Sequence, residues 1–175
     1  CPKLTWNDSY EPDYGKVYDL QALENMEVFY RYVDTDGDGI CYRTLPGVHP
    51  KGAYLIRGSG HNQYGGYTES EDEYLAVVDR LRRKFDTAAN LVPEPVVEVC
   101  NQPHGAIISI GSCDGAVRET RDRLEKEGIR LDYMRLRAFP FGEIVRNFLH
   151  THDRIFVVEQ NRDGQLRSLL LTEMD

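Results

Sequence analysis

Short apolar runs alternate with amphipathic stretches from residue 93 to the end of the chain. Three runs have the length and composition of β-strands: Ala106–Ile110, Leu131–Arg137 and Arg154–Val158. Each is followed by helical spacing, in the order Asp114–Glu127, Glu143–His150 and Gln165–Met174. Strands and helices that alternate over short connections predict an α/β fold with a small parallel sheet. The first and third runs are apolar throughout and are expected to be central strands covered on both faces.

A long amphipathic helix is predicted for residues 68–90. Its apolar positions recur every three or four residues and are expected to form one buried face: Tyr74, Val78, Leu81, Phe85 and Ala88. Thr68 and Glu71 have the spacing of a capping box at the helix start. The basic cluster Arg80–Lys84 falls largely on other faces and is predicted to be solvated. A weaker helical pattern spans Leu20–Tyr32.

These patterns divide the chain into three zones. Residues 1–38 are acidic and rich in Tyr, Asp and Pro, and are expected to form an extended arm or linker. Residues 39–92 combine a long glycine-rich loop with the amphipathic helix, and residues 93–175 form the α/β domain. A sheet of about three βα units leaves open edges, so we expect a packing partner or missing residues. The abrupt start at Cys1, without an initiator Met or a signal pattern, indicates a chain cut from a longer polypeptide.

Composition narrows the classes of function. The 175 residues carry a net charge of −8, from 29 acidic and 21 basic residues, and this disfavours a nucleic-acid partner. The apolar runs are too short to cross a bilayer, so no membrane is expected. Four cysteines without a C-x-x-C pair give no zinc or iron–sulfur ligand set, and no metal site is assigned. Cys100 and Cys113 are predicted to be reduced core thiols, which favours the cytoplasm.

Several short motifs permit more than one interpretation. Asp34–Gly39 resembles the first half of a calcium loop, but Leu45 stands where the twelfth-position Glu is required, so an acidic turn is expected. Gly111, Ser112, Asp114 and Gly115 lie where a strand turns into a helix and form a possible anion-binding loop, with a plain helix cap as the alternative.

Two further loops carry polar candidates. The glycine-rich loop places His49, Lys51, Arg57 and His61 on flexible backbone, where cations and imidazoles bind carboxylates or phosphates. Interface packing explains these residues equally well. Glu159–Gln165 follows the third predicted strand, at the edge where ligands gather in open α/β sheets. A polar loop without a ligand is the competing interpretation.

The order of four sequence blocks resembles the alpha subunit of 2-oxoacid:ferredoxin oxidoreductases, of the 2-oxoglutarate type. The blocks are Gly39–Gly65, Ile108–Glu119, Arg135–Phe141 and Val157–Arg167, and the resemblance extends from roughly Gly39 to Thr172, most of the chain. The resemblance implies a transketolase C-terminal-like domain, preceded by the extended arm, long loop and helix. Departures from the expected pattern occur at Asn62-Gln63, at Cys113 and at Cys41-Tyr42.

The resemblance also implies an activity that this chain does not perform alone. The family converts a 2-oxoacid and coenzyme A into acyl-CoA and CO2, and passes the electrons to ferredoxin. Thiamine diphosphate, magnesium and an iron–sulfur cluster are expected in the full complex but not on this chain. The implied partners of this chain are the beta subunit, the remainder of the alpha subunit and, through the complex, ferredoxin. No catalytic residue is assigned, because the thiamine ylid is the nucleophile.

The same resemblance suggests roles for the loop residues. The 47–66 loop is expected near the mouth of the active site, with Lys51, Arg57 and His61 approaching substrate or CoA phosphates. Residues that support the interface or the site are expected to be His49, Tyr64, Glu159, Asn161 and Arg162. The alternative is a free-standing interaction or nucleotide-sensing module that binds an adenine nucleotide at Gly111–Gly115.

Overall fold

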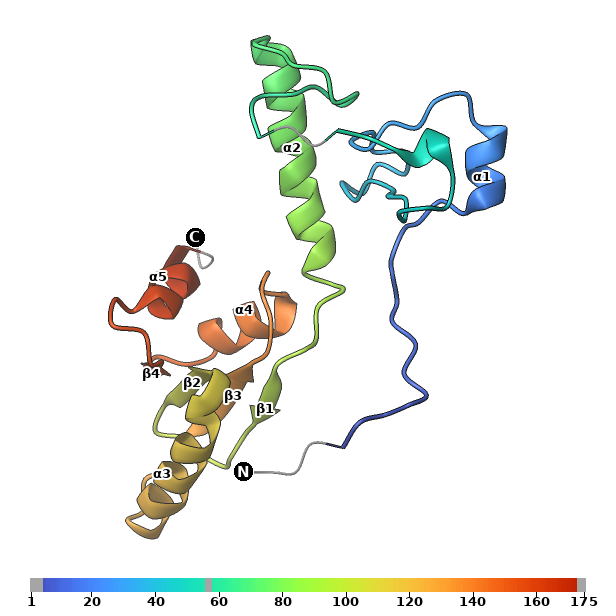
Figure 1. Ribbon diagram of the computed structural model, residues 1–175. Coiled ribbons are helices and arrows are strands. Elements are labelled where there is room, and N and C mark those ends of the chain that lie inside the picture. The colour runs from blue at the N-terminus through green and yellow to red at the C-terminus, as the bar shows by residue number, and fades with distance from the viewer. Residues whose placement is uncertain (1–4, 56–57, 173–175) are drawn as a thin grey trace. The chain divides into compact units, whose positions relative to one another are not determined.

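The computed structural model describes residues 5–55 and 58–172. The chain forms two compact units, Cys1–Thr87 and Ala88–Asp175. Both units contain several elements, of which Figure 1 labels the α-helices and the β-strands. In chain order they are α1 (Leu20–Asn25), the 3-10 turn η1 (Pro50–Gly52), α2 (Glu71–Ala88), β1 (Val96–Glu98), β2 (Ala106–Ile110), the 3-10 turn η2 (Gly111–Cys113), α3 (Asp114–Lys126), β3 (Asp132–Leu136), α4 (Glu143–His150), β4 (Ile155–Val158) and α5 (Gln165–Thr172).

The second unit contains a four-stranded sheet in the order β1-β3-β2-β4. The three predicted strands are confirmed, and both the β2–β3 and the β2–β4 pairs are parallel. Strand β1, which was not predicted from the sequence, pairs antiparallel to β3 with Val96 opposite Arg135. The sheet is therefore mixed: the three predicted strands run parallel, and β1 adds an antiparallel edge strand. Three residues are too few to show an alternating pattern, and the hydrogen bonds to β3 define this strand.

Helices cover both faces of this sheet (Figure 1). Alternate residues of β2 enter separate hydrophobic clusters, because successive side chains of a strand point to opposite faces. Ala106 and Ile108 pack in a cluster that includes residues of α4 and α5. Ile107 packs in a cluster that includes Val117 of α3. The burial predicted for β2 is confirmed.

Strand β4 is at the edge of the sheet rather than in its centre. Its Val157 packs against the larger cluster, but the Phe156 side chain stays 49% exposed. The expectation that this run is covered on both faces was therefore wrong. An uninterrupted apolar run cannot by itself distinguish a central strand from an edge strand with an uncovered face.

In the first unit, a helix was predicted over Leu20–Tyr32, but the observed helix α1 has only six residues and ends at Asn25. Its capping residue Met26 has an extended backbone conformation, and the chain then leads to Phe29, which is buried. The Phe29 ring packs edge-on against Tyr18 and Tyr54 at centroid distances of 6.1 and 5.8 Å. Burial of this ring is incompatible with a continued helix, so tertiary packing overrides a weak helical pattern.

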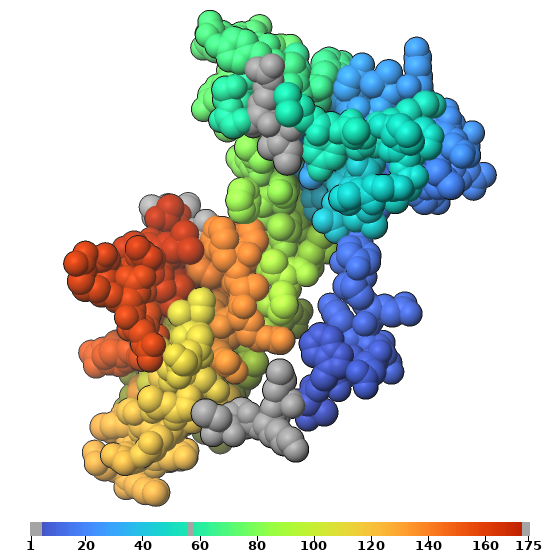
Figure 2. Space-filling view, in the orientation of Figure 1, coloured from blue at the N-terminus to red at the C-terminus, as the bar shows by residue number. Residues whose placement is uncertain are grey.

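Residues 5–15 contain no helix or strand, and Figure 2 shows this part of the chain in dark blue. The arm is anchored where it reaches Lys16, whose ammonium group lies 2.6 Å from a carboxylate oxygen of both Asp36 and Asp38. A parallel bridge joins Val17 to Arg43. The acidic turn predicted at 34–39 is observed, because Asp34 accepts hydrogen bonds from the backbone N–H groups of turn residues.

Helix α2 uses a different face from the one that its apolar pattern predicts. Among the described residues of α2 none is buried, and Tyr74 of the predicted core face is 62% exposed. The opposite face packs on the 38–40 segment: Arg80 Nη1 donates to the Gly39 carbonyl at 3.0 Å, and Thr87 Oγ1 to the Asp38 carbonyl at 2.6 Å. Arg80 is thus an inward-facing residue, and the prediction of a fully solvated basic cluster was wrong for it.

The start of α2 also differs from the predicted capping box. The helix begins at Glu71, and the Ser70 side chain accepts from the backbone N–H of Glu73 at 3.5 Å. Thr68 Oγ1 instead accepts from the backbone N–H of Ser70 at 3.1 Å. The capping residue is therefore Ser70, two positions later than predicted. Serine and threonine are both good caps, and only the backbone path selects between them.

Candidate functional site

The carboxyl ends of β2 and β4 form a topological switch point. The chain leaves β2 into α3, on one face of the sheet, and leaves β4 into α5, which belongs to the cluster on the other face. Loops that diverge from two adjacent parallel strands leave a crevice between them, where ligands bind in open α/β folds. Here Ser112 Oγ, after β2, lies 3.3 Å from Gln160 Oε1, after β4. The topology thus brings together two loops that were separate candidates in the sequence.

The loop after β2 has the glycine geometry expected of it but not the expected cap. Gly111 has a φ of +67°, and a Cβ added at Gly111 or Gly115 would meet no neighbouring atom. Cys113 precedes α3 without a side-chain cap, so a helix cap made by Ser112 or Asp114 was a wrong interpretation. The anion-binding function of this loop stays a prediction.

Asp114 is held in a hydrogen-bonded network below this loop. Its Oδ1 accepts from the Tyr133 hydroxyl at 2.8 Å and from Arg118 Nε at 3.0 Å. The hydrogen bond from Tyr133 and the positive charge of Arg118 hold the pKa of Asp114 below its ordinary value. The carboxylate is therefore ionised at neutral pH, and any anion bound at this helix start must face its negative charge.

The Tyr133 hydroxyl joins the carboxylate to the interior of the sheet. Ser109 is fully buried, and its Oγ lies 2.6 Å from the Tyr133 oxygen. Since Tyr133 has one proton and gives it to Asp114, Ser109 is the donor of that shorter bond. The guanidinium groups of Arg118 and Arg121 lie 5.6 and 5.3 Å from the Tyr133 ring centre. The network fixes the start of α3 against β2 and β3.

Replacing Tyr133 by phenylalanine is expected to lower the free energy of unfolding by about 1–2 kcal/mol, because the buried Ser109 hydroxyl loses its acceptor. Urea denaturation of the purified protein measures this difference. The control is Tyr74→Phe, which removes a hydroxyl from an exposed ring. Equal effects of the two substitutions would contradict a role for the buried bond.

The loop after β4 is organised mainly by its own side chains. Glu159 accepts hydrogen bonds from the backbone N–H groups of Leu166 and Arg167 at the start of α5, at 3.0 and 3.2 Å. Asn161 Nδ2 donates to Gln165 Oε1 at 2.8 Å. Arg162 is 91% exposed and pairs with Asp163 at 2.6 Å. Glu159 and Asn161 therefore shape the loop, while Arg162 is accessible from outside.

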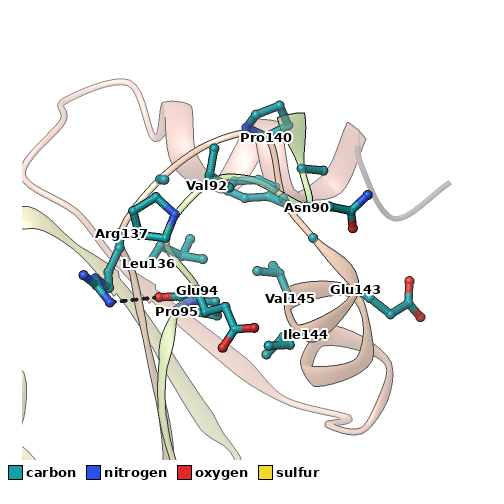
Figure 3. Close-up of a pocket in the computed structure, with 15 residues that line it drawn as sticks. Asn90, Val92, Glu94, Pro95, Leu136, Arg137, Pro140, Glu143, Ile144 and Val145 are labelled. Atoms are coloured by element: carbon teal, nitrogen blue, oxygen red, sulfur yellow. Dashed lines mark hydrogen bonds between the residues drawn. The ribbon is translucent and has the colours of Figure 1, made fainter. Parts of the chain in front are cut away.

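A cavity of about 160 Å³ adjoins the carboxyl end of β3. Figure 3 shows its lining, with Val92, Leu136 and Val145 among the apolar side chains and Arg137 bonded to the Glu94 carbonyl at 3.4 Å. The peptide bond Phe139-Pro140 in the β3–α4 loop is cis. Sequence analysis did not select these residues, although Arg135–Phe141 is one of the blocks that carry the family resemblance.

The candidates of the glycine-rich loop are spread over several local structures. His49 Nδ1 accepts from the backbone N–H of Lys51 at 3.1 Å, and Lys51 Nζ donates to the carbonyls of Glu24 and Met26 at the end of α1. His61 stacks on Tyr32 at 4.1 Å. Lys51 and His61 therefore contact different parts of the first unit, the end of α1 and the Tyr32 ring.

Two other candidates complete this set. Tyr64 packs edge-on against Tyr30, with the ring centres 4.9 Å apart. Arg57 lies outside the described residues. Proximity of Lys51, Arg57 and His61 to a substrate stays a prediction.

A second buried polar cluster lies at the amino end of β3, and no sequence pattern had indicated it. Asp132 Oδ2 is 3.0 Å from His152 Nε2, and Asp132 Oδ1 accepts from the backbone N–H of Cys100 at 2.8 Å. His152 Nδ1 is 2.7 Å from the Phe148 carbonyl oxygen. The His152 ring thus bridges the Asp132 carboxylate and the Phe148 carbonyl, and Thr151 Oγ1 also lies 3.2 Å from His152 Nδ1. Cys100 and Cys113 are both free thiols. Cys113 lies in the core as predicted, whereas Cys100 is only partly buried, so the prediction of a core thiol was wrong for Cys100.

Among residues 5–55 and 58–172 no group of three or more His, Cys, Asp or Glu side chains could hold a metal ion. In the same ranges no helix has both the length and the apolar character needed to cross a bilayer.

Comparison with known proteins identifies similar chains. No protein-family model matches this sequence. It is 29% identical over 155 residues, 86% of its length, to the alpha subunit of 2-oxoacid:ferredoxin oxidoreductase 2 of Aeropyrum pernix, of which it covers 24%. It is 31% identical over 118 residues, 65% of its length, to the 2-oxoacid:ferredoxin oxidoreductase alpha subunit of Saccharolobus solfataricus, of which it covers 19%. The chain thus spans about a quarter or less of these relatives.

A solved structure shares the fold. The 2-oxoglutarate:ferredoxin oxidoreductase of Magnetococcus marinus, with 2-oxoglutarate, coenzyme A and succinyl-CoA bound, matches 91% of this chain with a TM-score of 0.73 and 24% identity. This chain covers 27% of the matching chain. The α/β fold with its small sheet is therefore confirmed, and the chain resembles part of the alpha subunits of 2-oxoacid:ferredoxin oxidoreductases.

Proposed function

We propose that this chain is part of the alpha subunit of a 2-oxoacid:ferredoxin oxidoreductase. The observation that carries the proposal is the similarity of 86% of the chain to part of a 2-oxoacid:ferredoxin oxidoreductase alpha subunit. The complex would convert a 2-oxoacid and coenzyme A into acyl-CoA and CO2 and transfer the electrons to ferredoxin. We place the complex in the cytoplasm, where the free cysteines of this chain stay reduced.

The contribution of this chain is assembly of the complex and support of the active-site mouth. Exposed apolar positions on α2, such as Tyr74, Leu75 and Val78, form a surface that a larger body can cover. The uncovered edge of β4, with Phe156, offers a second contact. The partners in this proposal are the remainder of the alpha subunit, the beta subunit and, through the complex, ferredoxin.

The cofactors of the reaction belong elsewhere in the complex. The described residues provide no ligand group for magnesium, and Cys41, Cys100 and Cys113 are separate free thiols, so these residues do not fit an iron–sulfur cluster. Thiamine diphosphate, when bound, stabilises the carbanion left by decarboxylation.

We further propose 2-oxoglutarate as the 2-oxoacid. Support comes from the Magnetococcus marinus enzyme, which shares the fold and was solved with 2-oxoglutarate and coenzyme A bound. In this proposal Lys51, Arg57 and His61 approach the substrate or CoA phosphates, and His49, Tyr64, Glu159, Asn161 and Arg162 support that site or its interface.

Co-purification with an activity assay tests the proposal. The tagged full-length subunit is expected to bring down a thiamine-containing partner, and the complex is expected to reduce ferredoxin only when a 2-oxoacid and coenzyme A are both present. Among 2-oxoglutarate, pyruvate and 2-oxobutyrate, 2-oxoglutarate should give the highest kcat/KM.

A pair of variants on α2 examines the assembly role. Val78→Asp places a charge on the exposed apolar surface and should reduce the recovery of the partner, whereas Asp79→Asn on the same helix should not. A stable monomer that binds adenine nucleotides at Gly111–Gly115 and recovers no partner would contradict the proposal and favour the stand-alone module.

A further inference from the structure

The first unit contains a hollow of about 420 Å³ whose lining is strongly cationic. Six basic or imidazole side chains line it: Lys16, Arg31, Arg43, His61, Arg80 and Lys84. No Asp or Glu belongs to this lining within the described part of the chain. A concentration of positive charge is unexpected in a protein whose net charge is −8, and concave cationic surfaces attract anions.

The charges of the three arginines are not neutralised by acidic partners in the described ranges. Arg31 Nη1 donates to the Tyr42 carbonyl at 3.4 Å, and Arg43 donates through Nε and Nη2 to the Tyr14 carbonyl at 3.1 and 2.6 Å. Arg80 donates to the Gly39 carbonyl. Carbonyl oxygens hold these guanidinium groups in place but leave their full positive charge.

The nearby carboxylates already have other partners. Asp36 and Asp38 both bind the ammonium group of Lys16. Asp34 lies 3.4 Å from Arg83, which is not part of this lining. Lys16 is thus compensated, whereas Arg31, Arg43, Arg80 and Lys84 have no carboxylate within ion-pair distance in the residues that the structure describes.

Two further observations concern the hydrogen bonding of Arg80 and the charges around Cys41, both of which line the hollow. Arg80 Nε is buried and is the one such side-chain atom in the described residues that lacks a hydrogen-bond partner, a state that native proteins rarely leave unexplained. Cys41 also lines the hollow. Burial and the charge of Asp34 raise the pKa of its thiol, while the charges of Arg80, Arg31 and Lys84 act to lower it. Three of the lining side chains therefore act on this thiol with positive charge, against one carboxylate outside the lining.

From this geometry we propose that the hollow binds the diphosphate group of a small molecule. Guanidinium groups match the oxygens of phosphates through paired N–H donors, and a diphosphate supplies enough negative charge for several of them. The hollow is distinct from the switch-point loops, but it contains His61, which is proposed above to approach CoA phosphates. With coenzyme A as the ligand, the inference therefore rests on the proposed function and deepens it. Both a free nucleotide and coenzyme A carry a diphosphate group, so both classes of molecule have the group that this hollow recognises.

Calorimetry on the full-length subunit with inorganic diphosphate tests the site. Wild-type protein is expected to bind, Lys84→Gln to raise Kd about fivefold, and Lys84→Glu to raise it more than about tenfold, because one charge contact is lost or reversed. Arg82→Gln is the matched control, since it removes one positive charge from the same helix outside the hollow. Its Kd is expected to change by less than about twofold.

Alkylation of Cys41 provides an independent measurement. Bound diphosphate should slow the reaction of Cys41 with iodoacetamide, followed by peptide mass spectrometry, and leave Cys100 unchanged, because Cys100 lies in the other unit. ADP and coenzyme A serve as further probes, and the one that binds more tightly identifies the class of ligand that carries the diphosphate. The proposal is overturned if none of the three probes gives binding heat and none protects Cys41 from alkylation. An equal loss of diphosphate affinity in Lys84→Gln and Arg82→Gln overturns it as well.

Discussion

Replacing Asp132 by alanine is expected to lower the free energy of unfolding by about 3 kcal/mol, because removal of this buried carboxylate leaves the buried His152 ring without its hydrogen-bond partner. Both side chains are nearly inaccessible, at 7% for Asp132 and 8% for His152. The substitution also removes the acceptor of the Cys100 backbone N–H. Urea denaturation of the purified protein at neutral pH measures the effect. The control is Asp122→Asn, at an exposed position of α3.

The same carboxylate makes stability dependent on pH in a defined direction. Burial by itself raises the pKa of Asp132, but the hydrogen bonds from the Cys100 backbone and from His152 outweigh it and hold the pKa below the ordinary value. A lowered folded-state pKa stabilises the protein above the unfolded-state pKa, about 4 for Asp, and this contribution is lost as pH falls through the folded-state value. Stability of the wild type should therefore decline below about pH 4 more steeply than that of Asp132→Asn. Parallel curves for the two proteins would show that the pair does not contribute.

Substitution of Gly39 by alanine is expected to destabilise the first unit by about 3 kcal/mol, through a strained backbone and a steric clash together. Gly39 has a φ of +82°, and an added Cβ would lie 2.3 Å from the Lys84 nitrogen and 2.7 Å from the Arg80 carbonyl oxygen. These are backbone atoms of α2, which cannot rotate away, so the 38–40 segment must separate from the helix.

Gly37 provides a closely matched control for this prediction. Its φ is +77°, but nothing lies within 4 Å of an added Cβ. Gly37→Ala should therefore cost only about 1 kcal/mol, the conformational part alone. Hydrogen exchange of the backbone amides around Gly39 reports on the first unit separately from the second. Equal protection in the two variants would contradict the proposed contact with α2.

The candidate site was predictable in part. The glycine at the end of β2 and the polar loop after β4 are both visible in the sequence, because turn residues after apolar runs indicate the carboxyl ends of strands. The link between Ser112 and Gln160 was not visible, since it depends on β2 and β4 being neighbours. The cationic hollow was missed for a similar reason: Arg80 and Gly39 are 41 positions apart.

The sequence by itself determined the α/β class, the three parallel strands and the helices that follow them, because local periodicity reflects which side chains are buried within each element. Only the tertiary structure decided the rest. In the tertiary structure β1 joins the sheet and β4 lies at its edge. Helix α1 ends at Asn25, and the apolar face of α2 is exposed while Arg80 packs on Gly39. These features depend on contacts between residues that are distant in the chain, and periodicity within one element contains no information about such contacts.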